Sequence, residues 1–543
     1  MDQHNCDQTG KAWRDSEGTL HGLGYLPCYA WYSQTMGPSN WWLSTNDWSG
    51  YFMAERRANK SASKSLIASL GLRWELQQTP QPIALVNNPD LPLTGKPPSL
   101  GSQWGPHTGL AWSAGERHSQ VLRIGYGMFF GRTPNLTFED ALTQTGSPKG
   151  DLNYFMRPTD NLNTGGAPPF PYILAGAPGT VVKPGAVQFA PNFRNGEVHQ
   201  AVASIEQTLP GHIHLDASAV ATLGRRLPVT EDANIDPAVN PKTITYSIVD
   251  GNGSGPIKTS QLTVPFFASL PSASSPTGFA GRLDPNYQQV IEIAARANST
   301  YEAAVLRVTR NSRDGLTFHA RYSYAHTADW NPVETPSIVR PSVFDPTNQH
   351  DEYDASDLDV RHSATAAAIW QPRWRVRGEF SPIAHGWMLS GIGTLRSGLP
   401  YTMRTAGGLA KEFDTTGASI VALAPGINGY GGENRVYGVG RNTYRYPATW
   451  KADLRMAKRF DLGSMRQIEL LAESFNLFNH QNVTELETVG YSIEPGNPNG
   501  GLPKLNFLTG LKTGQTEFGR PLSVNAADFY RPRQIQFGLK MRF

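Results

Sequence analysis

The sequence predicts an all-β protein, an antiparallel transmembrane β-barrel of partial extent, with long extracellular loops and short periplasmic turns. Three observations predict this fold. Stretches of about ten residues alternate apolar and polar side chains, which matches a tilted strand that crosses a bilayer. Short and long connections between these stretches alternate along the chain. Tryptophan and tyrosine lie near the strand ends, as in the aromatic girdles of membrane barrels.

The composition agrees with a chain rich in turns. Of 543 residues, 39% are apolar and 10% aromatic, and there are 54 glycines and 41 prolines. The net charge of +3 is spread along the sequence, without the basic stripe typical of nucleic-acid binding, so no nucleic acid is expected as a partner. No run of 18 apolar residues occurs, which excludes a membrane-spanning helix.

The chain divides into residues 1–46, an N-terminal segment that is either a loop or a remnant strand, and residues 47–543, the barrel. About thirteen strands are expected, and long loops are expected at 133–196, 224–299, 327–359 and 480–532, with a small hairpin near Ile244 to Val264. The expected strands are 47–57, 66–75, 109–112, 122–130, 199–209, 213–222, 301–310, 316–324, 361–370, 387–395, 454–460, 468–472 and 533–543.

The last strand shows the pattern most clearly. In Arg533–Phe543, one face carries apolar residues and the other carries Gln, Gly, Lys and Arg. Strand side chains alternate with period two, so one face suits lipid and the other a wet lumen. A soluble sandwich can also end on such a strand, but it has no reason to sort its connections by length.

Several stretches, in order and spacing, resemble the C-terminal barrel of TonB-dependent outer-membrane receptors, in particular their Oar-like branch. The resemblance covers most of the chain from Asp47 onward. It implies a barrel filled by a plug, uptake of a solute with energy from the TonB complex, and a terminal aromatic, here Phe543, that the barrel assembly machinery recognises. The matching segments are 66–75, 121–131, 209–211, 359–362, 386–391 with 397–400, and 472–480.

The sequence also departs from this family. No plug, TonB-interacting segment or signal peptide is visible before Asp47. An odd number of strands is expected, whereas single-chain bacterial barrels have even numbers. We therefore expect a C-terminal part or truncated copy of a longer receptor, with the TonB complex as a partner only if a plug is present.

Charged residues on the polar face are candidates for contact with a plug or a passing solute, and the alternative is that they only solvate a wet interior. Strand histidines His199, His214 and His319 are expected on the same face. The lumen-facing candidates are Arg73, Arg123, Arg307, Arg321, Glu469 and Glu473. Loop aromatics that can stack on sugars or peptides are Tyr154, Phe155, Phe170, Tyr172, Trp330, Tyr401, Tyr430, Tyr437 and Tyr444.

No cofactor, resident metal or catalytic site is predicted. An acidic cluster between Asp345 and Asp359 can supply oxygen ligands to calcium, but it lacks the regular loop pattern, so a solvated loop is preferred. Cys6 and Cys28 can pair in an oxidising compartment or remain free thiols. No catalytic motif occurs, so the chain is not expected to be an enzyme.

The leading hypothesis is therefore an outer-membrane receptor barrel, in contact with outer-membrane lipid, that takes up an unidentified oligosaccharide or peptide. A second hypothesis is a plugless fragment that acts as a passive pore, a surface adhesin or a nonfunctional remnant. A third is a soluble secreted carbohydrate-binding β protein.

Overall fold

A computed structural model gives the fold of the chain. It describes residues 13–14, 20–21, 32–38, 40–61, 64–115, 119–156, 173–174, 176, 183–239, 241–267, 281–311, 315–330, 343–374, 376–378, 381–406, 412–413, 419–420, 426–428, 434–462, 466–494, 496, 501–510, 516–526 and 530–543.

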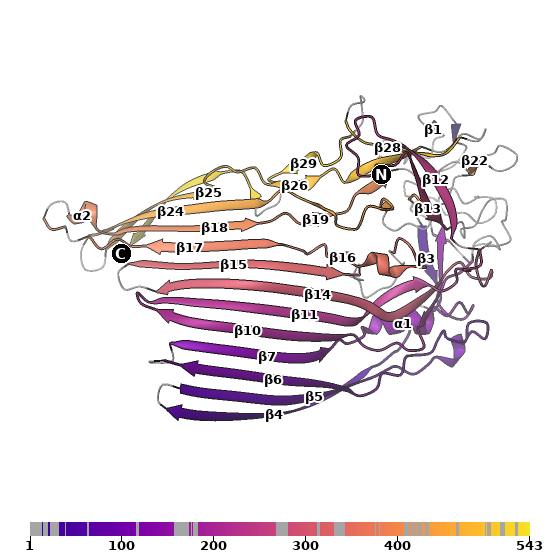
Figure 1. The fold of residues 1–543 in the computed structure, drawn as a ribbon, viewed down its shortest axis with the longest axis horizontal. Helices are drawn as coiled ribbons and strands as arrows, with labels where there is room; N and C mark the ends of the chain where they lie inside the picture. The colour runs from indigo at the N-terminus through magenta and orange to yellow at the C-terminus, as the bar shows by residue number, and fades with distance from the viewer. Residues whose placement is uncertain are drawn as a thin grey trace.

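One antiparallel sheet runs through the whole molecule (Figure 1). It has fifteen strands, and because β9 and β16 lie off its main path, thirteen remain, as predicted. In spatial order these are β4 (Asn46–Ser61), β5 (Lys64–Gln78), β6 (Gln103–Ala114), β7 (Gln120–Phe130), β10 (Glu197–Leu209), β11 (Ile213–Asp232), β14 (Val290–Asn311), β15 (Leu316–Asp329), β17 (His362–Trp370), β18 (Trp387–Arg396), β24 (Thr449–Asp461), β25 (Gln467–Phe475) and β30 (Gln534–Arg542).

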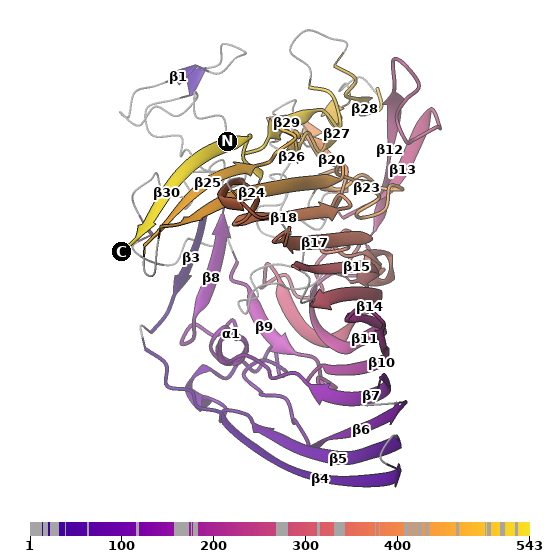
Figure 2. The same cartoon turned by 90° about the vertical axis from the view of Figure 1, so that its left-hand side faces the viewer.

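The sheet is an open trough (Figure 2). Its edges are β4 and β30, and among the described strands no pairing joins them. With thirteen antiparallel strands on the path, the two edge strands run in the same direction. The predicted barrel is therefore partial in the described residues.

The two faces of the sheet differ in polarity because the pairing register is maintained from strand to strand. Leu122, Ile205, Ala217, Leu306 and Tyr322 are successive register partners on one face. Ile205, Leu306 and Tyr322 are exposed there, as expected for side chains that contact lipid. The opposite face is polar, and Glu206, Asp216, Arg307 and Arg321 are successive register partners on it.

Long connections at one end of the trough fold into a layer of their own, with a second sheet in it (Figure 1). Tyr246, Met403, Ile427, Tyr491 and Leu505 form its core with no exposed surface. The predicted hairpin near Ile244 to Val264 is confirmed, and the described parts of the other long connections contain strands that were not predicted. The five strands are β13 (Gln261–Phe266), β12 (Lys242–Val249), β28 (Lys504–Phe507), β27 (Val489–Glu494) and β20 (Arg404–Ala406).

The stretch 133–196, predicted as one long loop, contains the helix α1 (Asn135–Thr143) and strand β9 (Ala186–Phe189). Strand β9 pairs in parallel with the start of β14. Phe138, Leu142, Phe189 and Ile293 are buried together between these elements. This second core fixes the loop segment against the end of the main sheet.

In the described part of the N-terminal segment, β3 (Tyr32–Met36) pairs with β8 (Leu152–Met156), which lies among the loops. No helix in the described part of the chain is long and apolar enough to span a membrane. The remaining elements are β1 (Trp13–Arg14), β2 (Leu20–His21), η2 (Ala84–Val86), η5 (Gln349–Glu352), β16 (Asp354–Ala355), α2 (Ser381–Ala384), β19 (Pro400–Tyr401), β21 (Glu412–Phe413), β22 (Ser419–Ile420), β23 (Tyr444–Arg445), β26 (Val483–Leu486) and β29 (Pro521–Val524).

Candidate functional site

The six residues predicted to face a lumen share the polar face of the sheet. Arg307 lies opposite Asp216 on one side and Arg321 on the other, and Asp216 lies opposite Glu206. These four side chains form a charged row across β10, β11, β14 and β15. Arg73 and Arg123 reach the same face through the registers of β5 to β10, and Glu469 and Glu473 reach it through β24.

Most of these charges already have a partner. Arg73 Nε lies 2.8 Å from Glu75 Oε1, and Arg123 pairs with Glu206. Arg455 bridges two strands, at 3.5 Å from Glu469 and 3.3 Å from Glu473. All of these pairs are partly exposed, so each contributes at most about 1 kcal/mol to stability.

Arg307 and Arg321 differ from this pattern. They are cross-strand neighbours of like charge, an arrangement that is destabilising unless an anion lies nearby. Within the described residues neither forms an ion pair. Arg307 also lines a hollow of about 190 Å³ on the polar face, together with Glu206, Asp216 and His214.

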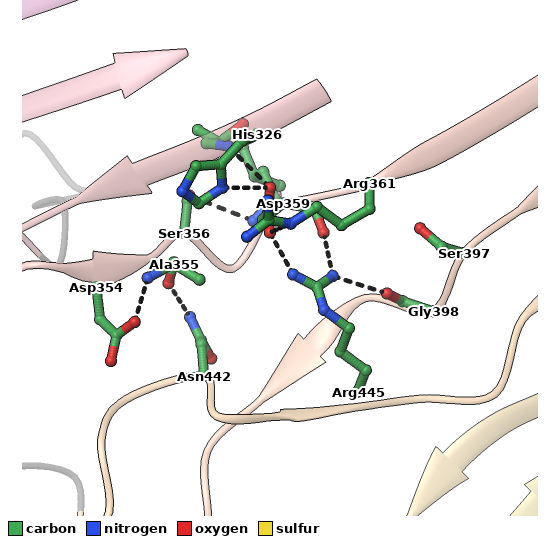
Figure 3. Close-up of polar contacts among 12 residues, drawn as sticks. His326, Asp354, Ala355, Ser356, Asp359, Arg361, Ser397, Gly398, Asn442 and Arg445 are labelled. Atoms are coloured by element: carbon green, nitrogen blue, oxygen red, sulfur yellow. Dashed lines mark hydrogen bonds and ion pairs between the residues drawn. The ribbon is translucent and has the colours of Figure 1, made fainter. Parts of the chain in front are cut away.

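The most connected polar group lies where the loops join the sheet, at Asp359 (Figure 3). Its carboxylate is fully buried and accepts hydrogen bonds from the Thr327 backbone N–H at 2.8 Å and from Arg361 Nε at 2.9 Å. Arg445 pairs with the same carboxylate, and His326 Nδ1 lies 3.2 Å from it. Asp359 therefore fastens the end of β15, the start of β17 and the strand β23 to one another.

The electrostatics of Asp359 follow from this environment. Burial alone raises the pKa of a carboxyl group, but the hydrogen bonds from Thr327, Arg445 and His326 and the charge of Arg361 outweigh it. The pKa of Asp359 is therefore held below its ordinary value. Asp359 is therefore a charged structural residue that links these segments, and it does not act as a proton donor in a reaction.

Two of the segments that resemble receptor motifs meet here. The His362 N–H donates to Ser397 Oγ at 3.0 Å, and the Ser397 N–H donates to the His362 carbonyl at 2.8 Å. Arg445 Nη1 donates to the carbonyl oxygens of Asp359, at 2.8 Å, and of Gly398, at 3.3 Å. The motifs 359–362 and 397–400 thus have a structural basis, because they build one joint between sheet and loops.

A third motif, 472–480, ends β25 with a turn. Asn476 has a φ of 49° and Asn479 one of 52°, a backbone conformation that asparagine tolerates better than most residues. The Asn476 amide donates to the carbonyls of His480, at 3.0 Å, and Arg531, at 3.2 Å. These bonds tie the turn to the chain that leads into β30.

The acidic cluster considered for calcium is divided among cationic partners. Glu352 pairs with buried Arg435, and Arg441 lies 3.6 Å from Asp357. Throughout the described ranges, no group of three or more His, Cys, Asp or Glu side chains could hold a metal ion. Glu352, Asp357 and Asp359 of this cluster thus face arginines.

A hollow of about 340 Å³ adjoins the Asp359 joint. Its lining includes the exposed Asp357, Arg396 and the two tyrosines Tyr446 and Tyr530. Arg396 and Thr449 are register partners on the polar face of the sheet, so the hollow lies where that face meets the loops. Hydroxyl groups, aromatic rings and both charges suit a polar solute with ring or peptide groups.

The aromatic residues predicted to lie on loops have different surroundings in the structure. Tyr401, Tyr444 and Phe518 pack together: the ring centroids of Tyr401 and Tyr444 are 5.7 Å apart, and those of Tyr444 and Phe518 are 4.9 Å apart. Tyr154 is buried and Trp330 packs against a small core, so neither is an exposed stacking platform. Tyr437 stacks on Phe344 in the loop core. Phe170, Tyr172, Tyr430, the side chain of Phe155, and both cysteines, Cys6 and Cys28, lie outside the described residues.

One histidine prediction is wrong. His199 pairs in register with Met128 and lies on the apolar face, where its Nδ1 is 2.8 Å from the hydroxyl of Tyr126. His199 is spaced by multiples of two from Ala201, Ala203 and Ile205, so the alternation within β10 already places it on the apolar face, and the pairing of β10 with β7 agrees. A second pair of this kind, Tyr322 with His362, lies on the same face, also at 2.8 Å.

The continuous antiparallel sheet, its apolar and polar faces, and its alternating short and long connections are those of an outer-membrane β-barrel protein. Residues 26–536 match the family described as the outer membrane beta-barrel domain, and the chain belongs to this family. The protein is therefore located in the cell outer membrane, which excludes the hypothesis of a soluble secreted protein. The family is one of membrane barrels and not of enzymes.

Solved structures with a similar arrangement are outer-membrane transporters. They include the transporter YddB from Escherichia coli, with 6% identity over 92% of this chain and 54% of that chain and a TM-score of 0.37. The ferric-catecholate import receptor Fiu from E. coli K12 has 10% identity over 92% of this chain and 45% of that chain, with a TM-score of 0.37. The siderophore receptor PiuA from Acinetobacter baumannii has 9% identity over 92% of this chain and 43% of that chain, with a TM-score of 0.38. The chain spans about half the length of these transporters or less. No curated protein matches it.

Proposed function

We propose that the chain forms the wall of an outer-membrane transporter of the TonB-dependent kind, in its Oar-like branch, and takes up an oligosaccharide or a peptide. The observation that supports this most directly is the hollow beside Asp357, Arg396, Tyr446 and Tyr530, at the junction of loops and polar face. A solute captured there would next meet the charged row of Glu206, Asp216, Arg307 and Arg321.

The partners follow from this proposal. Outer-membrane lipid surrounds the apolar face, and the barrel assembly machinery recognises the terminal Phe543. Arg307 and Arg321, which form no ion pair with the residues that the structure describes, contact anionic groups of whatever occupies the trough, either a plug or the solute. Energy from the TonB complex requires a plug, so TonB is a partner only where one is present.

Uptake in cells tests the proposal. Fluorescent maltooligosaccharides and a fluorescent peptide mixture are offered to a Gram-negative host that expresses the chain, with and without a functional TonB complex. We expect accumulation that requires both the chain and TonB, and a loss of accumulation in the Arg396→Ala, Tyr446→Ala double variant. Lys258→Ala, on an exposed loop away from the hollow, serves as the matched control.

The alternative function is that of a passive pore, a surface adhesin or a remnant without transport. The wide polar face favours the pore among these. Planar-bilayer recordings distinguish it, because a pore gives a steady conductance without energy, whereas a TonB-dependent transporter stays closed. Accumulation that persists without TonB, together with steady conductance, would replace the transporter proposal by the pore.

A further inference from the structure

The connection 371–386, between β17 and β18, differs from the others at its end of the sheet. The neighbouring connections are the short segments 62–63, 115–119, 210–212, 312–315 and 462–466. This one contains the short helix α2 and projects beyond the strands (Figure 1). It exposes large apolar side chains, with Trp374 at 46%, Val376 at 37% and Ile383 at 63% of their surface.

The connection is held against the apolar face of the sheet. Trp387 and Lys458 are register partners on that face, in line with Leu389 and Met456. Trp387 Nε1 donates to the Ile383 carbonyl at 2.8 Å, and Lys458 Nζ donates to the same carbonyl at 3.0 Å. Lys458 also donates to the carbonyl of His385. These bonds fix the segment on the lipid side of the sheet.

Lys458 shows that this contact is built into the fold. A lysine on a lipid-facing surface is costly unless its charge is shielded or reaches the interface. Here the side chain is only 6% exposed, and its ammonium group lies 5.1 Å from the centre of the Trp387 ring and 4.9 Å from that of Phe460. Two carbonyls from the connection complete its surroundings, so the segment and the lysine stabilise each other.

The exposed surface of the connection is amphipathic and continues the lipid-facing band. The Trp374 ring meets the edge of Trp370, with centroids 6.2 Å apart, and Trp370 pairs with Leu389 on the apolar face. His385 Nε2 lies 2.6 Å from the Trp374 carbonyl and fixes the backbone there. Arg373 and Arg377 are exposed beside these apolar residues. Neither arginine has an ion-pair partner among the residues that the structure describes.

We propose that residues 371–374, 376–378 and 381–386 form an interfacial segment that binds the phospholipid surface of the periplasmic leaflet. Trp374, Val376 and Ile383 enter the boundary of the acyl chains, and Arg373 and Arg377 contact lipid phosphates. Interfacial segments bind through this combination of apolar area and cationic side chains. A lipid partner is preferred over a periplasmic protein because the apolar surface is continuous with the face already in contact with the membrane.

The first experiment measures where Ile383 lies. A nitroxide label is attached to Ile383→Cys in a Cys6→Ser, Cys28→Ser background, and the full chain is reconstituted in phosphatidylethanolamine–phosphatidylglycerol nanodiscs. We expect relaxation by oxygen to exceed relaxation by a water-soluble nickel complex. Asp461→Cys, at the same end but on the polar face, is the matched control and should show the opposite order. If Ile383→Cys does not fold, Val376→Cys tests the same surface.

The second experiment measures the lipid preference. Arg373→Gln with Arg377→Gln is compared with a control pair, Lys64→Gln with Arg466→Gln. The control removes two exposed cations at the same end of the sheet, one at the start of β5 and one in the connection 462–466. We expect the first pair to lower the preference for phosphatidylglycerol over phosphatidylcholine nanodiscs by roughly 25-fold, since each cation near the surface contributes about fivefold. The control pair should retain the preference.

Either of two results would overturn the proposal. One is an Ile383 label that is as accessible to the nickel complex as the Asp461 label, which would leave the apolar surface free for a periplasmic protein. The other is an equal loss of lipid preference in both arginine and control pairs, which would show that the effect depends on net charge and not on this segment.

Discussion

Asp359 concentrates more polar contacts than any of the predicted site residues, although the sequence presented it only as one carboxylate in an acidic run. Asp359→Asn removes the buried charge that Arg361 and Arg445 face, and leaves these two donors poorly paired. We expect unfolding to become easier by about 3 kcal/mol. Denaturation in detergent measures this, with Asp351→Asn, an exposed member of the same run, as the control. Equal stability of the two variants would refute the role of Asp359.

The same carboxylate predicts an acid-sensitive joint. Its pKa is lowered in the folded chain from an ordinary value of 3.8, so its contribution to stability is complete above that pH. The contribution is lost as the pH falls below 3.8 and through the lower folded pKa. Hydrogen exchange at the Thr327 amide should therefore accelerate in that window. In Asp359→Asn the acceleration should be absent, and its persistence there would assign the effect to another group.

Gly398 predicts a steric requirement in the same joint. A Cβ atom at this position would overlap the carbonyl oxygen of Tyr446. We expect Gly398→Ala to separate the two backbones and to destabilise the loops, by roughly 2 kcal/mol or more. The comparison is Gly251→Ala, where no atom lies within 4 Å of the new methyl group. Limited proteolysis of the loops should distinguish the variants, and identical cleavage rates would contradict the prediction.

At the scale of elements, periodicity predicted the strands of the main sheet well. In β30, Ile535 to Met541 alternate with period two, and the alternation depends only on local sequence. Periodicity could not reveal partners. Strand β12 pairs with β28 through Ser247 and Lys504, which are far apart in sequence, and short polar stretches such as β20 have no alternation to detect. The joint at Asp359 was missed for the same reason, because its donors come from three separate segments.

Two buried tyrosines of the second sheet, Tyr491 and Tyr246, lead us to expect that alkali destabilises this sheet. Burial raises the pKa of Tyr491 to about 12 and that of Tyr246 further still, whereas the ordinary value is 10.0. Both hydroxyls stay protonated in the folded layer, so the stability they contribute is complete below pH 10 and is lost as the pH rises above it. Tyrosinate absorbance should show a late, cooperative step that coincides with loss of near-ultraviolet dichroism.

The control for this response is Tyr246→Phe. It removes one titrating group and the hydrogen bond of 2.7 Å to the Ile427 carbonyl. The late step should become smaller by one tyrosine. An unchanged amplitude would mean that Tyr246 ionises with the exposed tyrosines.

At the scale of the whole molecule, the terminal Phe543 is expected to direct assembly. It is 87% exposed, so folding in detergent should not depend on it. Deleting Phe543 should lower the amount of chain inserted in the outer membrane of cells, while refolding of the purified chain is unchanged. Phe543→Trp retains a terminal aromatic and should restore insertion. Equal insertion of the deletion and the parent chain would remove Phe543 from the assembly signal.

Strands β4 and β30, which are the edges of the main sheet among the described strands, finally limit by their direction which strands can pair with them. Strands β4 and β30 both run from the loop end to the short-turn end, so an antiparallel partner for either must run outward. A second copy inserted with the same orientation presents only inward-running edges. An edge-to-edge contact between β4 or β30 of neighbouring copies would therefore be parallel, unlike the antiparallel pairing between successive strands along the described sheet.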